Sequence, residues 1–134
     1  MKRIIYTRGD GVAVITPSAE YLKTHTIEEC AAKDVPAGVP FRIINDDEVP
    51  SDRTFRNAWK DDNGIKVDMP KAIEITKTRL RAERKPLLEA QDVLFQRALE
   101  SGADTSEIVK EKQRLRDITK ITATELNELK ELSA

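Results

Sequence analysis

The chain has 134 residues, of which 39% are hydrophobic and 35% are charged, with a formal net charge of −1. This length allows one domain or a small head with a helical tail, and the composition favours exposed, self-associating helices over a deep enzyme pocket. The mixed charges indicate neither nucleic acid nor a membrane surface as a partner. No apolar run is long enough for a transmembrane helix. The single Cys30 cannot form an internal disulfide.

Two β-rich runs begin the chain, residues 2–6 and 12–16. Between them, Gly9, Asp10 and Gly11 can supply the positive φ angles of a tight turn, so we predict a β-hairpin. The turn contains an Arg-Gly-Asp triplet, which needs no cell-adhesion role to explain it, because short motifs often match by chance and this one serves as a turn.

Two short helices are predicted next. Pro17 is favoured at the first position of a helix, because its fixed φ is already helical. Thr26, followed three residues later by Glu29, has the spacing of a capping box and starts a second helix. This helix should end near Lys33, because the residue before Pro36 is disfavoured in helical geometry.

Two features invite a metal-site hypothesis, and neither fits one. His25 has no second ligand-type side chain at a suitable spacing, so we interpret it as a solvated linker residue. The acidic cluster at Asn45-Asp46-Asp47-Glu48 lacks the twelve-residue calcium-loop pattern, so we interpret it as a solvated loop. The sequence also has no Ser-His-Asp set and no glycine-rich phosphate loop. We therefore expect no metal, no cofactor and no enzymatic activity.

A third strand is expected at residues 41–44, after a proline-flanked turn. Farther on, Asn63-Gly64 is a strong hairpin signal between two runs that can each join a sheet. Residues 55–60 precede this hairpin and fit either a strand or a helical turn.

The only tryptophan, Trp59, follows Phe55 by four residues and has Arg53 and Arg56 nearby. Aromatic faces beside guanidinium groups can hold nucleotides or single-stranded bases, so these residues are a possible binding site. The interpretation that we favour is a hydrophobic anchor of the head, with the two arginines on its surface.

A long helix is predicted from Pro70 to Glu100, followed by a partner from Asp104 to Thr119. Asp68 can cap the first helix, Gly102 can end it, and Asp104 with Glu107 has capping-box spacing. The pair should form a helical hairpin whose apolar residues, at a seven-residue step on the first helix, make a stripe buried against another copy or a tail protein. This predicted stripe consists of Ile73, Leu80, Leu87, Leu94 and Leu115.

Pro86 interrupts the hydrogen bonding of the long helix, so we expect a bent rod rather than two separate helices. A basic run precedes this proline. Its side chains could track phosphates, pair with acidic residues of a neighbouring subunit or remain solvated, and the last two are favoured. The run consists of Lys77, Arg79, Arg81, Arg84 and Lys85, of which Arg81 and Arg84 are candidate binding residues.

Together these elements predict an α+β fold with two parts. Residues 1–68 form a small head, with a β-hairpin or sheet and short helices. Residues 69–134 form the helical hairpin and a short last helix, which is capped near Thr122 and has leucines along one face.

Several segments resemble a family of small proteins encoded by tailed bacteriophages and prophages. The most specific are Asp-Arg-Thr-Phe-Arg-Asn-Ala-Trp at 52–59 and Gln-Arg-Leu-Arg-Asp-Ile-Thr at 113–119. Weaker similarity at residues 3–44, 67–72 and 84–93 extends the resemblance over nearly the whole chain. The C-terminal segment is also similar to tail and tail-fibre assembly chaperones, although this chain lacks their proline-rich ending.

The resemblance implies a structural or morphogenesis protein of a bacteriophage, which docks with other phage proteins or with itself. Such a protein would work in the host cytoplasm during assembly, and retention in the virion stays open. One alternative is a counter-defence protein that binds a nucleotide or a host protein through Arg53, Arg56, Trp59 and the basic run. A DNA-binding regulator ranks last, because three glutamates on the helices at 16–33 would repel phosphates.

Overall fold

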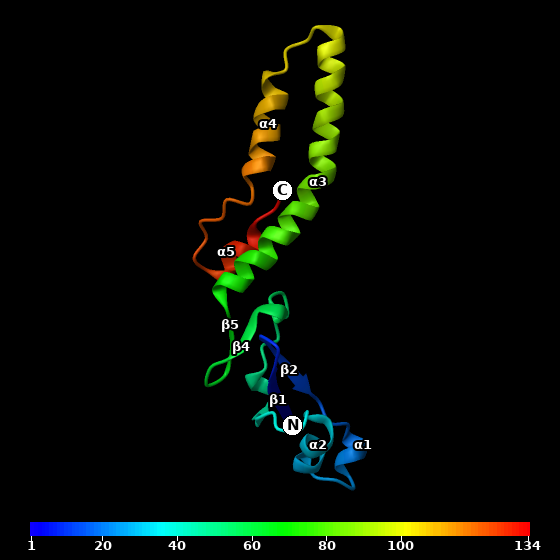
Figure 1. Cartoon of the computed structure of the whole chain (residues 1–134), viewed down its shortest axis with the longest axis vertical. Helices are drawn as coiled ribbons and strands as arrows, with labels where there is room; N and C mark the ends of the chain where they lie inside the picture. Colours follow the sequence, from blue (N-terminus) through cyan, green and yellow to red (C-terminus); the bar gives the residue numbers. More distant parts are fainter. The chain divides into compact units, whose positions relative to one another are not determined.

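The computed structural model describes residues 1–134 and divides into two compact units, Met1–Asp68 and Met69–Ala134 (Figure 1). The first unit contains a small antiparallel sheet, a separate two-stranded hairpin and short helices, and the second contains only helices. The predicted α+β fold, with a long C-terminal helix, is thereby confirmed.

The sheet of the first unit has three antiparallel strands in the order β2-β1-β3. Their bounds are Lys2–Arg8 for β1, Gly11–Ile15 for β2 and Phe41–Asn45 for β3. Arg8 pairs with Gly11, which leaves a two-residue loop between β1 and β2. Of that loop only Gly9 has a positive φ, of 61°, as in a II′ turn with glycine at its first central position. The predicted first hairpin is confirmed.

The two short helices are α1 (Ala19–Leu22) and α2 (Ile27–Asp34). Ser18 caps α1, so this helix begins after the Pro17 position that we expected, because a serine oxygen can accept a helix N–H. Before α2, the Thr26 hydroxyl accepts the N–H of Glu29 at 3.1 Å, and the Glu29 carboxylate accepts the N–H of Thr26 at 3.1 Å. This predicted capping box is confirmed.

The sheet has a separate core on each face, because successive strand residues point to opposite sides. Ile4 packs with Cys30, Ala31 and Val35, which belong to α2 and its end. Ile5 packs on the other face, with Val12, Ile44 and Trp59. The sheet therefore lies between α2 and the segment that carries Trp59.

Trp59 begins the second hairpin, which pairs β4 (Trp59–Asp61) with β5 (Ile65–Val67). Asn63 and Gly64 both have positive φ, as the hairpin signal predicted. Residues 55–60, for which the sequence fitted either a strand or a helical turn, contain both. A 3₁₀ turn at Arg56–Ala58 (η2) leads directly into β4. A second 3₁₀ turn, η1, spans Asp46–Glu48.

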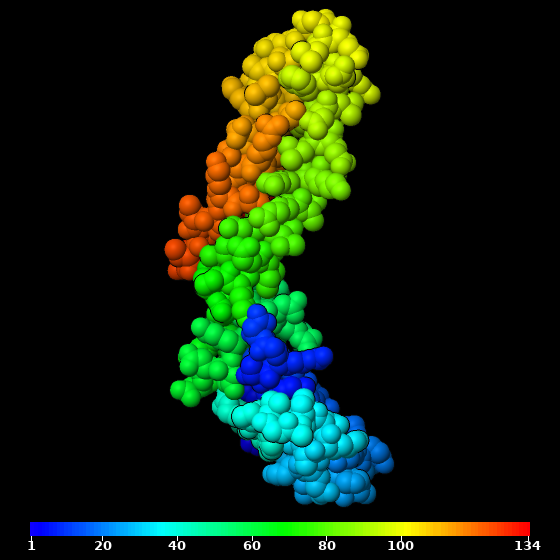
Figure 2. Space-filling view, viewed as in Figure 1, coloured from blue at the N-terminus to red at the C-terminus, as the bar shows by residue number.

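The second unit consists of α3 (Met69–Ser101), α4 (Ser106–Asp117) and α5 (Leu126–Glu131). Pro86 lies inside α3, which continues through it and bends about midway along its length (Figure 1). The long helix is therefore a bent rod, as expected from a proline that removes one helix hydrogen bond. α4 returns beside the second half of α3, and Figure 2 shows its orange atoms against the yellow-green atoms of α3.

The turn between α3 and α4 is closed by a Schellman motif. Gly102 has a φ of 70°, Ala103 N–H donates to Ala98 at 2.9 Å, and Gly102 N–H donates to Leu99 at 3.3 Å. The expected capping box at Asp104 is wrong. The Asp104 carboxylate accepts the N–H and the hydroxyl of Ser106 instead, and Thr105 is the residue that precedes α4.

Candidate functional site

The predicted apolar stripe of the helical unit does not form one continuous surface. Leu80 and Leu115 are completely buried, and Ile73 is half-buried. Leu87 and Leu94 are 42% and 45% exposed. Two of the five proposed interface residues are therefore core residues of the unit itself, and an interface can use only the exposed members.

The stripe divides because a seven-residue step falls about 20° short of two full helical turns. The fully inward position after Leu80 is Ala98, which follows it by 18 residues, or about five turns. Each seven-residue step therefore places Leu87, and then Leu94, farther around the helix from this inner line. The bend at the middle of α3 separates the two halves further.

One side of the seam between α3 and α4 is closed by Lys112. Its Nζ lies 2.7 Å from the Asp92 carboxylate and 4.9 Å from the centre of the Phe95 ring. The Lys112 side chain is only 16% exposed, so its hydrocarbon stem covers apolar surface between the helices. Leu87 and Leu94 lie across the inner line of α3 from Asp92 and Phe95.

Part of the basic run has a structural role. Arg84 donates to the carbonyls of Leu115 at 3.4 Å and of Arg116 at 3.0 Å, near the end of α4. Arg79 donates to the carbonyl of Leu129 in α5 at 3.1 Å. The last carbonyls of a helix have no partner within it, so these two arginines cap α4 and α5. Arg81, the other candidate of this run, is exposed.

An exposed apolar strip lies on the free side of α3. We define the α3 strip as Leu87, Ala90 and Leu94, all of them exposed and spaced at i, i+3 and i+7. Glu83 precedes the strip by one turn and Arg97 follows it. Hydrogen bonds from Arg79 and from the Ala134 N–H hold the pKa of Glu83 below its usual range, so this carboxylate is charged at neutral pH.

The aromatic and arginine candidates of the head do not form a stacking platform. Trp59 is only 1% exposed, and the Arg53 guanidinium lies 5.9 Å from the centre of its ring. A base could stack on Trp59 only if the core opened. The geometry is that of a hydrophobic anchor with a surface arginine over it, worth about 0.5–1 kcal/mol as a cation–π contact.

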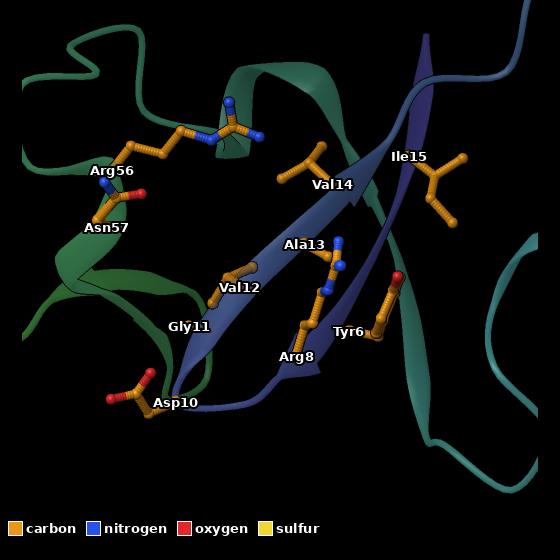
Figure 3. A pocket seen from close by; sticks show the side chains of 10 residues that line it. All are labelled: Tyr6, Arg8, Asp10, Gly11, Val12, Ala13, Val14, Ile15, Arg56 and Asn57. Carbon is orange, nitrogen blue, oxygen red and sulfur yellow. The ribbon is translucent and has the colours of Figure 1, made fainter.

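A hollow of about 500 Å³ on the head was not predicted. It follows the edge strand β2, and Arg56 is the one predicted site residue that reaches it (Figure 3). Its other lining residues are Tyr6, Arg8, Asp10, Gly11, Val12, Ala13, Val14, Ile15 and Asn57. A sign of it in the sequence is the uncharged run Gly-Val-Ala-Val-Ile, which is unusual for an edge strand.

Cys30 is buried, and this burial raises the pKa of its thiol. A protonated, covered thiol is a poor nucleophile. No group of three or more His, Cys, Asp and Glu side chains is arranged to hold a metal ion. No helix is both long and apolar enough to cross a membrane.

Comparison with known proteins found no matching family model, no matching curated protein and no matching solved structure.

Proposed function

We propose that this chain is a bacteriophage structural or morphogenesis protein that acts by docking, first of all with copies of itself through the α3 strip. The resemblance at residues 52–59 and 113–119 supports the phage assignment. The observation that carries the docking role is the exposure of Leu87 and Leu94 on one side of a long helix. Exposed apolar surface on one face of a helix is typical of protein interaction sites.

The charges that flank the strip favour a second copy as the occupant. In an antiparallel pairing of two α3 helices around Ala90, Leu87 of each copy faces Leu94 of the other. The same two-fold arrangement brings Glu83 of one copy near Arg97 of the other, and it does so twice. The small side chain of Ala90 at the centre allows the helices to approach to about 8–10 Å.

The first test is the substitution Leu87→Asp. A charge forced into an apolar interface strongly opposes association, so the variant should be monomeric on light scattering while the parent is a dimer or larger. Leu99→Asp is the matched control, because Leu99 is 55% exposed on the same helix but lies about 120° or more around it from Leu87, Ala90 and Leu94. Equal masses for the parent and Leu87→Asp would refute the proposed interface.

The substitution Ala90→Cys tests the antiparallel geometry. Two Ala90 positions lie next to the two-fold axis, so mild oxidation should link two copies through a single disulfide. Glu89→Cys, which points about 100° away on the helix, should cross-link much less. Native Cys30 is buried and should not interfere. Equal cross-linking of the two variants would reject this arrangement.

The phage assignment is tested by mass spectrometry of purified particles against the lysate of the phage or prophage that encodes the chain. Stoichiometric recovery in particles identifies a virion component. Abundance in the lysate with absence from particles identifies an assembly factor. Expression outside the lytic cycle, with no association with phage proteins, would contradict both.

A further inference from the structure

The strand β2 forms an outer edge of the three-stranded sheet. It contains no charged residue and no proline, and its pairing with β1 continues without a bulge from Gly11 to Ile15. Natural proteins usually protect such edges, because their unpaired backbone groups can bind another strand. Three of the common protecting devices, namely charged side chains, proline and a β-bulge, are therefore absent from β2.

The free backbone groups of β2 follow from its register. Residue pairs in an antiparallel ladder alternate between hydrogen-bonded and non-hydrogen-bonded. Because Arg8 and Gly11 close a two-residue loop, theirs is a hydrogen-bonded pair, and so is Tyr6 with Ala13. The N–H and C=O groups of Val12 and Val14 therefore point away from β1.

No other segment uses these outward groups. β4 lies close to β2, but it is hydrogen-bonded only to β5. The backbone hydrogen bonds of turns and loops include none to Val12 or Val14. Two donors and two acceptors thus face the hollow from a strand whose other edge is already paired.

The hollow has the form that an added strand requires. It runs along all five residues of β2 and has a volume of about 500 Å³. Figure 3 shows Arg56 and Asn57 on the side of Val12 and Val14, while Tyr6 and Arg8 lie on the other side of the strand. A five-residue extended segment of about 17 Å would span it.

The charged residues at the edge of β2 favour an acidic ligand segment. Arg8 and Arg56 line the hollow from opposite sides, and their guanidinium groups have no hydrogen bond or ion pair within the chain. Asp10 is the only acidic residue of the lining, and it is engaged in an interaction within the chain. Two guanidinium groups therefore remain for carboxylates of a ligand.

We propose that β2 is a strand-addition site that binds an extended, acidic segment of another protein. Backbone hydrogen bonds to Val12 and Val14 hold the segment, and its carboxylates pair with Arg8 and Arg56. A second copy of β2 fits less well, because it would bring further arginines to an edge that already has two.

The two arginines also specify a spacing. They lie on opposite faces of the sheet, and successive side chains of a bound strand point to opposite faces. Two glutamates an odd number of positions apart can therefore reach both arginines. Two glutamates an even number of positions apart can reach only one.

Two fluorescent hexapeptides of identical composition test the site with the full-length protein. Val-Thr-Glu-Glu-Thr-Val has adjacent glutamates, and Val-Glu-Thr-Glu-Thr-Val has them two positions apart. The first should bind about tenfold more tightly by anisotropy, the value of one charge-assisted hydrogen bond, and should shift the amide resonances of Val12 and Val14. Equal affinities, or no binding of either peptide at millimolar concentration, would overturn the proposal.

Charge reversals locate the binding. Arg56→Glu and Arg8→Glu should each weaken binding of the first peptide at least tenfold. Lys23→Glu makes the same charge change just after α1 and should change the affinity less than about twofold. Unchanged affinity in both arginine variants would overturn the proposal. So would amide shifts of Val12 and Val14 that depend on protein concentration alone, because they would identify a second copy as the occupant.

Discussion

The two units have similar lengths but cover their apolar side chains very differently. In the head, Ile4 and Ile5 are completely buried on opposite faces of one sheet, and Trp59 is nearly so. In the helical unit, three of the six buried side chains are small, namely Ala72, Thr76 and Ala98. Five of the seven large exposed hydrophobic residues belong to this unit, namely Leu87, Val93, Leu94, Leu99 and Val109.

The difference follows from geometry. A short three-stranded sheet has two faces, and one helix with one hairpin can cover both. A helix in a two-helix pair buries only one stripe of its circumference, and α5 is too short to cover the rest of α3. The helical unit thus leaves side chains available for docking, whereas the head leaves the backbone edge of β2. The helical unit would bind a partner through apolar side chains, and the head would bind one through backbone hydrogen bonds.

The largest expected effect is on the core of the head. Trp59→Ala removes a buried indole from the cluster with Ile5, Val12 and Ile44, and it should cost about 3–5 kcal/mol. Urea denaturation followed by NMR should show loss of the head resonances at much lower denaturant than in the parent. A midpoint within experimental error of the parent would show that this cluster is not the stabilising core.

A matched pair on α4 tests the division between buried and exposed positions. Leu115→Ala should cost about 2–5 kcal/mol, because Leu115 is completely buried. Val109→Ala should change the free energy of unfolding by less than about 0.5 kcal/mol, because Val109 is 49% exposed. The comparison would fail if both variants lost equal stability at a concentration where the protein is monomeric.

Capping by arginine has a smaller expected effect. Arg84→Met keeps an apolar stem but removes the donors to the carbonyls of Leu115 and Arg116, so it should destabilise the helical unit by about 1 kcal/mol. Arg81→Met is the control, because Arg81 is exposed. Equal thermal midpoints for the two variants would assign no stabilising role to the Arg84 cap.

The smallest expected effect is a pH dependence in the head. Hydrogen bonds from the Arg42 guanidinium, one of them at 2.9 Å, hold the pKa of Asp61 below its usual range. A carboxyl group with a lowered folded-state pKa stabilises the fold above its unfolded pKa of about 3.9, and this contribution is lost as the pH falls through the folded value.

Asp61→Asn should therefore destabilise the head at neutral pH by less than about 1 kcal/mol, because the ion pair is partly solvated. The difference from the parent should shrink in denaturation experiments as the pH falls below about 3.9. Asp62→Asn is the neighbouring control, with a side chain that is 65% exposed. A difference that stays constant between neutral and acid pH would exclude the ion pair as its source.

Much of the local structure could be predicted because its causes lie within a few residues. The capping box of Thr26 and Glu29, the positive φ of Gly102 and the hairpin at Asn63-Gly64 depend on backbone geometry and on neighbouring side chains. The long bent helix through Pro86 follows in the same way from periodicity and from one missing N–H. These features determine the α+β fold class by themselves.

The tertiary structure alone decided which side of each element is covered. A seven-residue pattern could not distinguish the buried Leu80 from the exposed Leu87. That difference depends on the rotation that accumulates along the helix and on where α4 and α5 lie. The same holds for Arg84, whose partners are carbonyls about thirty residues away, and for Arg8 and Arg56, which line the same hollow from opposite sides. Sequence spacing reports the direction of a side chain along its own element, and only packing determines what that side chain meets.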